Sequence, residues 1–66
     1  MFILNYQKLT DEELKTDNNF RMVLQALYQN TTLAKSSLIG ATQKPMGLGF
    51  IYHVYFRLET GAIVKV

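Results

Sequence analysis

The sequence contains no cysteine and only one histidine, His53, among its 66 residues. Without thiols the chain can form neither a disulfide nor a thiolate metal site, and one imidazole cannot build a zinc site unless several carboxylates lie beside it. A domain this short buries only about 60% of the surface that its unfolded chain exposes. Its stability must come from a small core that buries many of its apolar residues or from self-association, and we expect a homo-oligomer.

Long hydrophobic runs and dense charge clusters are also missing. No segment approaches the roughly 18 apolar residues of a membrane span, and the first residues lack the basic start and long apolar run of a signal peptide. We therefore predict a cytoplasmic protein that has no membrane partner. The net charge is +2, and the seven basic residues are scattered along the chain. This distribution permits a nucleic-acid partner without demanding one.

Motifs for catalysis or cofactor binding are absent from the sequence. Four of the five carboxylates lie between Asp11 and Asp17, where they suit helix capping better than acid–base chemistry. Ser36 and Ser37 lack the strand-turn-helix context of a nucleophile elbow. Gly47 and Gly49 are too few for a phosphate-binding loop and suggest a flexible entry to a strand. We expect a protein that is not an enzyme and that holds no cofactor and no metal.

The first third of the chain predicts a short strand followed by a short helix. Apolar and mixed positions alternate from Phe2 to Tyr6, as in a pleated, half-buried strand. Thr10 and Glu13 have the spacing of a capping box, which predicts a helix from about Asp11 to Lys15. The run Asp17-Asn18-Asn19 would end that helix and cap the next one.

Two further helices are expected in the middle of the chain. Phe20, Val23, Leu24 and Leu27 lie at i, i+3, i+4 and i+7, which predicts a helix with a core-facing stripe that ends at Gln29-Asn30. A third helix would begin at Thr31 and Thr32, run to about Thr42, and end at the Lys44-Pro45 step. Its inner face would carry Leu33, Ala34, Ser37, Leu38 and Ala41, and its outer face Thr32, Lys35, Ser36, Ile39 and Gln43.

The C-terminal third predicts a β-hairpin. Residues 50–58 alternate between a wholly apolar face and a mixed face, as in a sheet that is covered on one side. Glu59-Thr60-Gly61 suits a short turn before a last strand from Ala62 to Val66. The same stretch also places Ile51, Val54, Tyr55 and Leu58 at helical spacing, so a helix is an alternative. Its aromatic and β-branched content favours the strand.

These elements predict a single α+β domain over residues 1–66, in the order β-α-α-α-β-β. The three strands would form one antiparallel sheet, with the helices against its apolar face. We predict a shared core because the following residues all lie on the apolar side of their elements: Leu24, Leu27, Leu38, Val54 and Phe56.

Part of this pattern resembles the winged helix-turn-helix superfamily of DNA-binding proteins. The segment from Val23 to Tyr28, followed by Thr32-Leu33-Ala34, is similar to the first two helices of many such regulators. The segment from Arg57 to Val64 is similar to the stretch that leaves their recognition helix and starts the wing. The resemblance implies a winged-helix-like fold and a small DNA-binding regulator of transcription. The recognition helix would then be either residues 50–56 or residues 31–42.

If residues 31–42 are the recognition helix, the outer face of that helix would enter the major groove. Base reading there uses Arg, Lys, Asn or Gln, and phosphates attract further basic side chains. The expected DNA-binding residues are Thr32, Lys35, Ser36, Gln43, Lys44 and Arg57.

A protein partner is the alternative, as a small modulator or inhibitor of another protein or as a dimeric structural module. Tyr and Arg are enriched at interface hot spots, and a chain that ends in a strand at Val66 leaves an edge for pairing. Gathering of Lys35, Lys44 and Arg57 on one surface would favour DNA, whereas their dispersal beside an exposed apolar patch would favour a protein. The candidate protein interface comprises Ile51, His53, Tyr55, Ile63 and Lys65.

Overall fold

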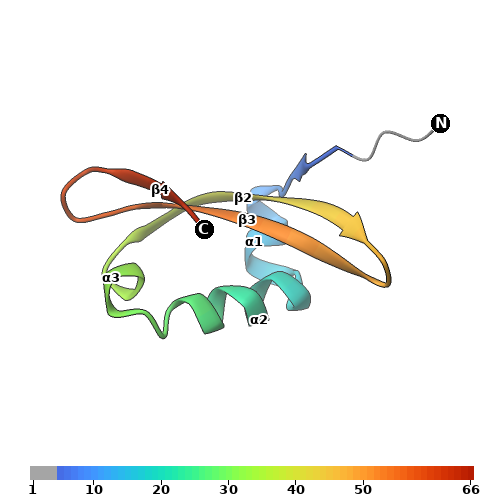
Figure 1. Cartoon of the computed structure of the whole chain (residues 1–66), viewed down its shortest axis with the longest axis horizontal. Helices are drawn as coiled ribbons and strands as arrows, with labels where there is room; N and C mark the ends of the chain where they lie inside the picture. Colours follow the sequence, from blue (N-terminus) through green and yellow to red (C-terminus); the bar gives the residue numbers. More distant parts are fainter. Residues whose placement is uncertain (1–4) are drawn as a thin grey trace.

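The computed structural model describes residues 5–66 and has an α+β architecture. Four strands form one open antiparallel sheet in the order β1-β2-β3-β4, and the three helices lie on one side of it (Figure 1). The α+β class is confirmed, whereas the predicted count of three strands is one too few. The elements are β1 (Gln7–Lys8), α1 (Asp11–Thr16), α2 (Asn18–Leu27), α3 (Thr31–Ala34), β2 (Ser37–Met46), β3 (Gly49–Arg57) and β4 (Ile63–Lys65).

The starts of α1 and α2 follow the predicted caps. The N–H of Glu13 donates to Thr10 Oγ1 at 3.1 Å, and the N–H of Thr10 donates to Glu13 Oε1 at 3.0 Å. Asp17 ends α1 and begins α2, since its side chain accepts from the N–H of Phe20 at 3.1 Å. These bonds satisfy N–H groups that the first turn of a helix leaves unpaired, which confirms the capping box and the second cap.

The first strand lies later in the chain than predicted. Of the predicted strand, residues 2–4 lie outside the described residues, and the next two are not in a strand. The pairing that makes β1 joins Gln7 to Gln43 and Lys8 to Thr42 of β2. A further hydrogen bond, from the N–H of Leu9 to the carbonyl of Ala41 at 2.9 Å, anchors the segment just before α1.

The predicted third helix over residues 31–42 is wrong. Helix α3 covers only Thr31–Ala34, and the hydroxyl of Ser36 donates to the carbonyl of Leu33 as the helix ends. The chain then enters β2, which pairs with β3 from Ser37 to Met46. Pro45 therefore lies inside a strand and does not end a helix. Residues 37–46 pair with the next strand in a long hairpin, and these pairings outweigh the local helical spacing.

A tight turn joins β2 to β3. Met46 pairs with Gly49, so the loop consists of Gly47 and Leu48 alone. Gly47 has a positive φ of 59°, and no other residue of this turn does. A two-residue loop with positive φ at its first position matches the twist of an antiparallel hairpin. Gly47 and Gly49 thus belong to a defined hairpin turn and not to a flexible entry.

The predicted C-terminal hairpin is confirmed. Strand β3 pairs with β4, and the register joins Tyr55 to Lys65 and Arg57 to Ile63. This pairing excludes the helical alternative for the stretch. The N–H of Leu58 donates to the carbonyl of Ala62 at 2.8 Å and closes the turn. Gly61 has a φ of 91°, the left-handed conformation expected of it.

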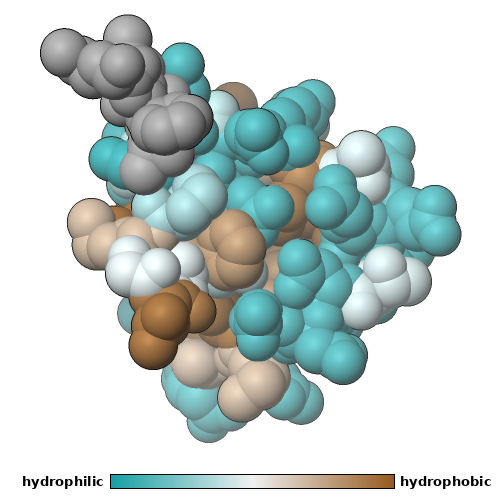
Figure 2. Space-filling model, turned by 90° about the vertical axis from the view of Figure 1, so that its right-hand side faces the viewer, coloured by the Kyte–Doolittle hydropathy of each residue, from teal (hydrophilic) through white to brown (hydrophobic). Residues whose placement is uncertain are grey.

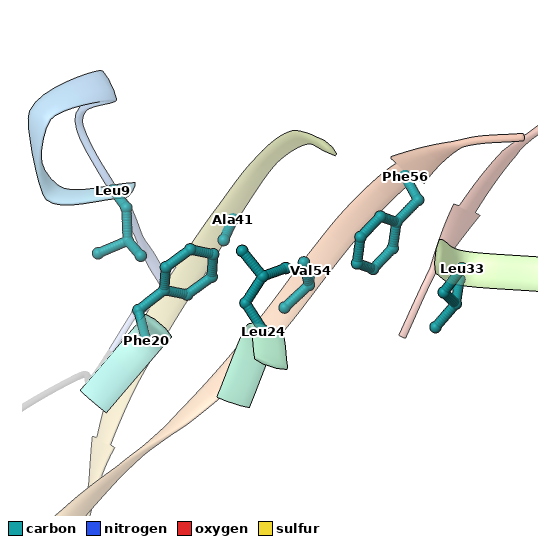
Figure 3. Close-up of a cluster of buried hydrophobic side chains, with 7 residues drawn as sticks. All are labelled: Leu9, Phe20, Leu24, Leu33, Ala41, Val54 and Phe56. Atoms are coloured by element: carbon teal, nitrogen blue, oxygen red, sulfur yellow. The ribbon is translucent and has the colours of Figure 1, made fainter. Parts of the chain in front are cut away.

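The core lies between the sheet and the helices. Figure 3 shows side chains of α2 and α3 directed at those of β2 and β3. Of the predicted core, Leu24, Val54 and Phe56 are buried, whereas Leu27 and Leu38 pack half-buried at the edge of the cluster. The buried hydrophobic residues are Leu9, Phe20, Leu24, Leu33, Ala41, Val54 and Phe56.

The hydroxyl of Tyr52 is buried beside this core without a hydrogen-bond partner among residues 5–66. Burial raises the pKa of Tyr52 above its ordinary value of 10.0, and the negative charge of Asp17 raises it further. The folded protein therefore holds the phenolic proton more tightly than the unfolded chain does. The stability of the fold therefore does not change with ionisation of Tyr52 below pH 10, and it falls as the pH rises from 10 through the raised pKa.

Replacement of Tyr52 by phenylalanine should leave the melting temperature unchanged or raise it at pH 7, because an unpaired buried hydroxyl is removed. Above pH 10, the wild-type protein should lose stability with pH more steeply than the variant. Thermal melts of both proteins at neutral and alkaline pH measure this difference. A clearly lower melting temperature of Tyr52→Phe at pH 7 would show instead that the hydroxyl stabilises the fold.

Candidate functional site

The sheet has one face that no described element covers. Ala41, Val54 and Phe56 point toward the helices, and because side chains alternate along a strand, their neighbours point to the opposite side. In Figure 1, α2 and α3 lie below the sheet, α1 starts at the level of the strands and runs downward behind them, and no helix is drawn over the upper side. We call this uncovered side the open face; it carries Tyr6, Lys8, Ile39, Gly40, Thr42, Lys44, Ile51, His53, Tyr55, Arg57, Ile63 and Lys65.

Charge is unevenly divided between the two sides of the molecule. The open face holds four of the seven basic residues and none of the five carboxylates. The carboxylates lie in α1, at the start of α2 and in the turn between β3 and β4. The positive charge of the open face is therefore much denser than a net charge of +2 suggests, and it would attract a polyanion. The basic residues are Lys8, Lys44, Arg57 and Lys65.

Aromatic rings lie among these charges. The rings of Tyr6 and His53 approach to 4.5 Å between centroids, with planes tilted by 51°. Lys44 Nζ lies 5.6 Å from the centroid of the Tyr6 ring, within the range of a cation–π contact. Tyr6 remains 41% exposed. One end of the open face thus combines an accessible ring pair with an ammonium group.

A shallow depression lies near the middle of the open face. The pairing of β2 with β3 shifts between Leu38 and Gly40, which makes Ile39 the extra residue of a β-bulge. Because Gly40 has no side chain, a space of about 210 Å³ remains above it. A Cβ atom added to Gly40 would meet no atom within 4 Å. The depression is lined by Lys8, Ile39, Gly40, Ala41, Thr42 and Tyr55.

A second hollow lies on the helix side of the sheet, between α2 and the β2–β3 turn. Its volume is about 360 Å³, and most of the residues that line it are apolar. Leu48 is fully exposed beside it, and Met22 and Phe50 are largely exposed. Figure 2 views the molecule from this end and shows apolar surface gathered beside hydrophilic surface. We call this region the tip cleft: Asn19, Met22, Val23, Leu48, Gly49, Phe50 and Tyr52.

The structure does not bring the six expected DNA-binding residues together. Lys44 and Arg57 lie on the open face, but Gln43 pairs with Tyr52 on the opposite side of the sheet. Thr32 is exposed on α3, Lys35 is exposed at its C-terminal cap, and Ser36 is half-buried. The shared outer helix face of Lys35, Ser36 and Gln43 does not exist, because residues 37–46 form a strand.

All five residues of the alternative protein interface lie on the open face, together with residues that the sequence did not single out. Tyr6 lies at the end of the predicted first strand, whose partner strand was not identified. Lys8 lies in β1, for which no element was predicted, and the other missed residues lie in β2, most of which was predicted as a helix. One local signal could have indicated β2, since Gly47 and Leu48 have the composition of a two-residue hairpin turn and such a turn requires a strand on each side. The missed residues are Tyr6, Lys8, Ile39, Gly40 and Thr42.

Metal ligands are not clustered within residues 5–66, where no three His, Cys, Asp or Glu side chains lie close enough together to hold an ion. In the same part of the chain, no helix has the length and apolar character needed to cross a membrane. No family model matches this sequence, and no curated protein or solved structure is significantly similar to it.

Proposed function

We propose that this protein is a non-catalytic binding protein that engages nucleic acid through the open face. The observation that supports this function is the combination of four basic side chains, no carboxylate and exposed rings on one uncovered sheet surface. Basic side chains bind phosphates with release of counterions, and rings stack on bases. Lys35 lies away from Lys44 and Arg57, which weighs against groove reading by a helix and keeps a protein partner as the alternative for the open face. Phosphate binding and stacking need no recognition helix.

The open face is long enough to contact several nucleotides. Lys44 pairs with Ile51, and Arg57 lies six residues farther along β3, roughly 20 Å away at the rise of a β-strand. Lys8 and Lys65 lie between these ends, on the two outer strands of the sheet. A role as a small DNA-binding regulator, which the winged-helix resemblance implies, would use this face in place of the helix over residues 31–42.

A fluorescence anisotropy titration with labelled oligonucleotides tests the proposal. We expect dissociation constants below about 100 μM at low salt, as for non-specific binders. If all four basic residues contact phosphates, the logarithm of the affinity for a single strand should fall with the logarithm of the salt concentration with a slope of about −3. Absence of binding in this range would reject nucleic acid and leave an acidic protein as the partner of the open face.

We also propose self-association through the tip cleft. The chain is short and contains no disulfide that could stabilise it. Met22, Leu48 and Phe50 are exposed and line the same cleft. A second copy that covers them would bury apolar surface without burying a charge. Sedimentation at about 100 μM, a concentration above the dissociation constants of weak dimers, should show a dimer that Leu48→Ser converts to a monomer. A wild-type protein that is monomeric at this concentration would exclude this function.

A further inference from the structure

We infer that the depression above Gly40 is a subsite for one unstacked base of a single-stranded nucleic acid. The inference rests on the proposed function, because it assumes that the open face binds nucleic acid. It adds the form of the ligand, the place where one of its bases lies, and the residues that hold that base.

Nothing in the described fold requires glycine at position 40. Its φ is not positive, unlike that of Gly47 or Gly61, and a Cβ atom there would have no neighbour within 4 Å. Glycine inside a strand weakens the strand and often marks a β-bulge, such as the one at Ile39, or a place where a ligand approaches the backbone closely. Gly40 itself is buried, and it lines the depression on the open face together with Ile39 and Tyr55.

The size and lining of the depression suit a flat ring attached to an anion. Its volume of about 210 Å³ is below the range of roughly 300–1,000 Å³ for pockets that hold a whole small molecule. Ile39, Thr42 and the ring of Tyr55 provide apolar walls, and Lys8 provides a positive charge at the rim. Lys65 lies next to Tyr55 across the β3–β4 pair. A base stacked on Tyr55 would thus have a cation on each side for its flanking phosphates.

A single strand fits this arrangement better than a duplex or a free nucleotide. Bases of a duplex are stacked and paired, so a ring can enter the depression only if it is unstacked first. The basic residues continue in both directions along the face, to Lys44 at one end and Arg57 at the other, which exceeds the length of one nucleotide. The exposed Tyr6–His53 pair offers a second place for stacking near Lys44.

The test fills the depression and compares ligands with and without bases. Gly40→Val places a side chain in the depression, and the strand tolerates it because valine favours β-structure. Gln7→Val is the control: Gln7 also lies in a strand and is exposed, but it pairs with Gln43 and so lies on the side of the sheet opposite the depression. The ligands are a thymidine 12-mer, an abasic sugar–phosphate 12-mer, a 12-base-pair duplex and a uridine RNA 12-mer.

We expect the wild-type protein to bind the thymidine 12-mer more tightly than the abasic 12-mer or the duplex. Gly40→Val should weaken binding of the thymidine 12-mer by between about 5-fold and 100-fold, the effect of losing one base–aromatic stack, and leave abasic binding unchanged. Tyr55→Leu, which removes the ring but keeps an apolar side chain, should have the same selective effect. Gln7→Val should change neither affinity. The RNA should bind like the DNA, since both contain the contacted bases and phosphates.

Three results would overturn the inference while leaving nucleic-acid binding in place. They are equal affinity of the wild-type protein for the abasic and thymidine 12-mers, a preference for the duplex, and unchanged thymidine binding by both Gly40→Val and Tyr55→Leu. Failure of the wild-type protein to bind any of the four ligands at low salt would instead reject the proposed function itself. Melting temperatures of all variants confirm that each one is folded at the temperature of the titration.

Discussion

Replacement of Phe56 by alanine is expected to lower the free energy of unfolding by about 3–5 kcal/mol, the usual cost of removing a buried phenylalanine side chain. Phe56 is 0% exposed and lies between Val54 and Leu33 in the core (Figure 3). Small domains have a total stability of roughly 5 kcal/mol at the lower end of the usual range, so the variant should be largely unfolded at room temperature.

The size of this effect follows from the contacts that Phe56 makes. It pairs with Leu38 on one neighbouring strand and with Val64 on the other, so its side chain lies over the middle of the sheet. Its ring also meets the ring of Tyr28 edge-on, with 5.9 Å between centroids. Truncation leaves a cavity bordered by three elements that cannot all move inward, which adds to the loss of apolar burial.

Phe50→Ala is the matched control for Phe56→Ala. Phe50 lies on the same strand and the same side of the sheet, but it is 46% exposed. We expect its truncation to cost about 1 kcal/mol, because only part of the ring leaves an apolar environment. Urea unfolding followed by circular dichroism measures both variants. Equal losses for the two would contradict the placement of Phe56 in the core.

The double charge reversal of Lys44→Glu with Arg57→Glu is expected to weaken single-strand binding by at least about 100-fold at low salt. Each substitution removes a phosphate contact and adds a repulsive charge, and loss of two contacts should reduce the salt slope by about 1.4. Neither side chain belongs to the buried core, so the fold should persist. Anisotropy titrations at several salt concentrations, together with thermal melts, measure these quantities.

Lys15→Glu with Lys35→Glu is the control for this double reversal. It changes the net charge by the same amount, but Lys15 lies in α1 and Lys35 follows α3, so both are away from the open face. In the titration at 0.1 M salt we expect its effect on affinity to be less than about threefold, because exposed charges more than about 10 Å apart are largely screened at that salt concentration. A similar loss in both double variants would mean that net charge, and not the open face, controls binding.

The parts of the fold that the sequence by itself determined are those with a local physical cause. The capping box of Thr10 and Glu13 and the cap at Asp17 act within four residues of chain, and both helices begin where these side chains predict. The stripe of α2 and the alternation of β3 each satisfy one period over a whole element, so their buried sides could be identified. The last turn also has a local cause, because Gly61 can adopt the positive φ that this turn requires.

The second strand and the open face were decided only by the tertiary structure. Residues 31–42 satisfy helical spacing, but Ser37–Met46 forms hydrogen bonds with β3, whose residues lie up to 20 positions away in the sequence. Such pairing depends on the partner strand, and a shift of register by one residue would move every side chain to the opposite face of the sheet. Lys8, Lys44, Arg57 and Lys65 are scattered in the sequence, and they share one surface because that register places their four strands side by side.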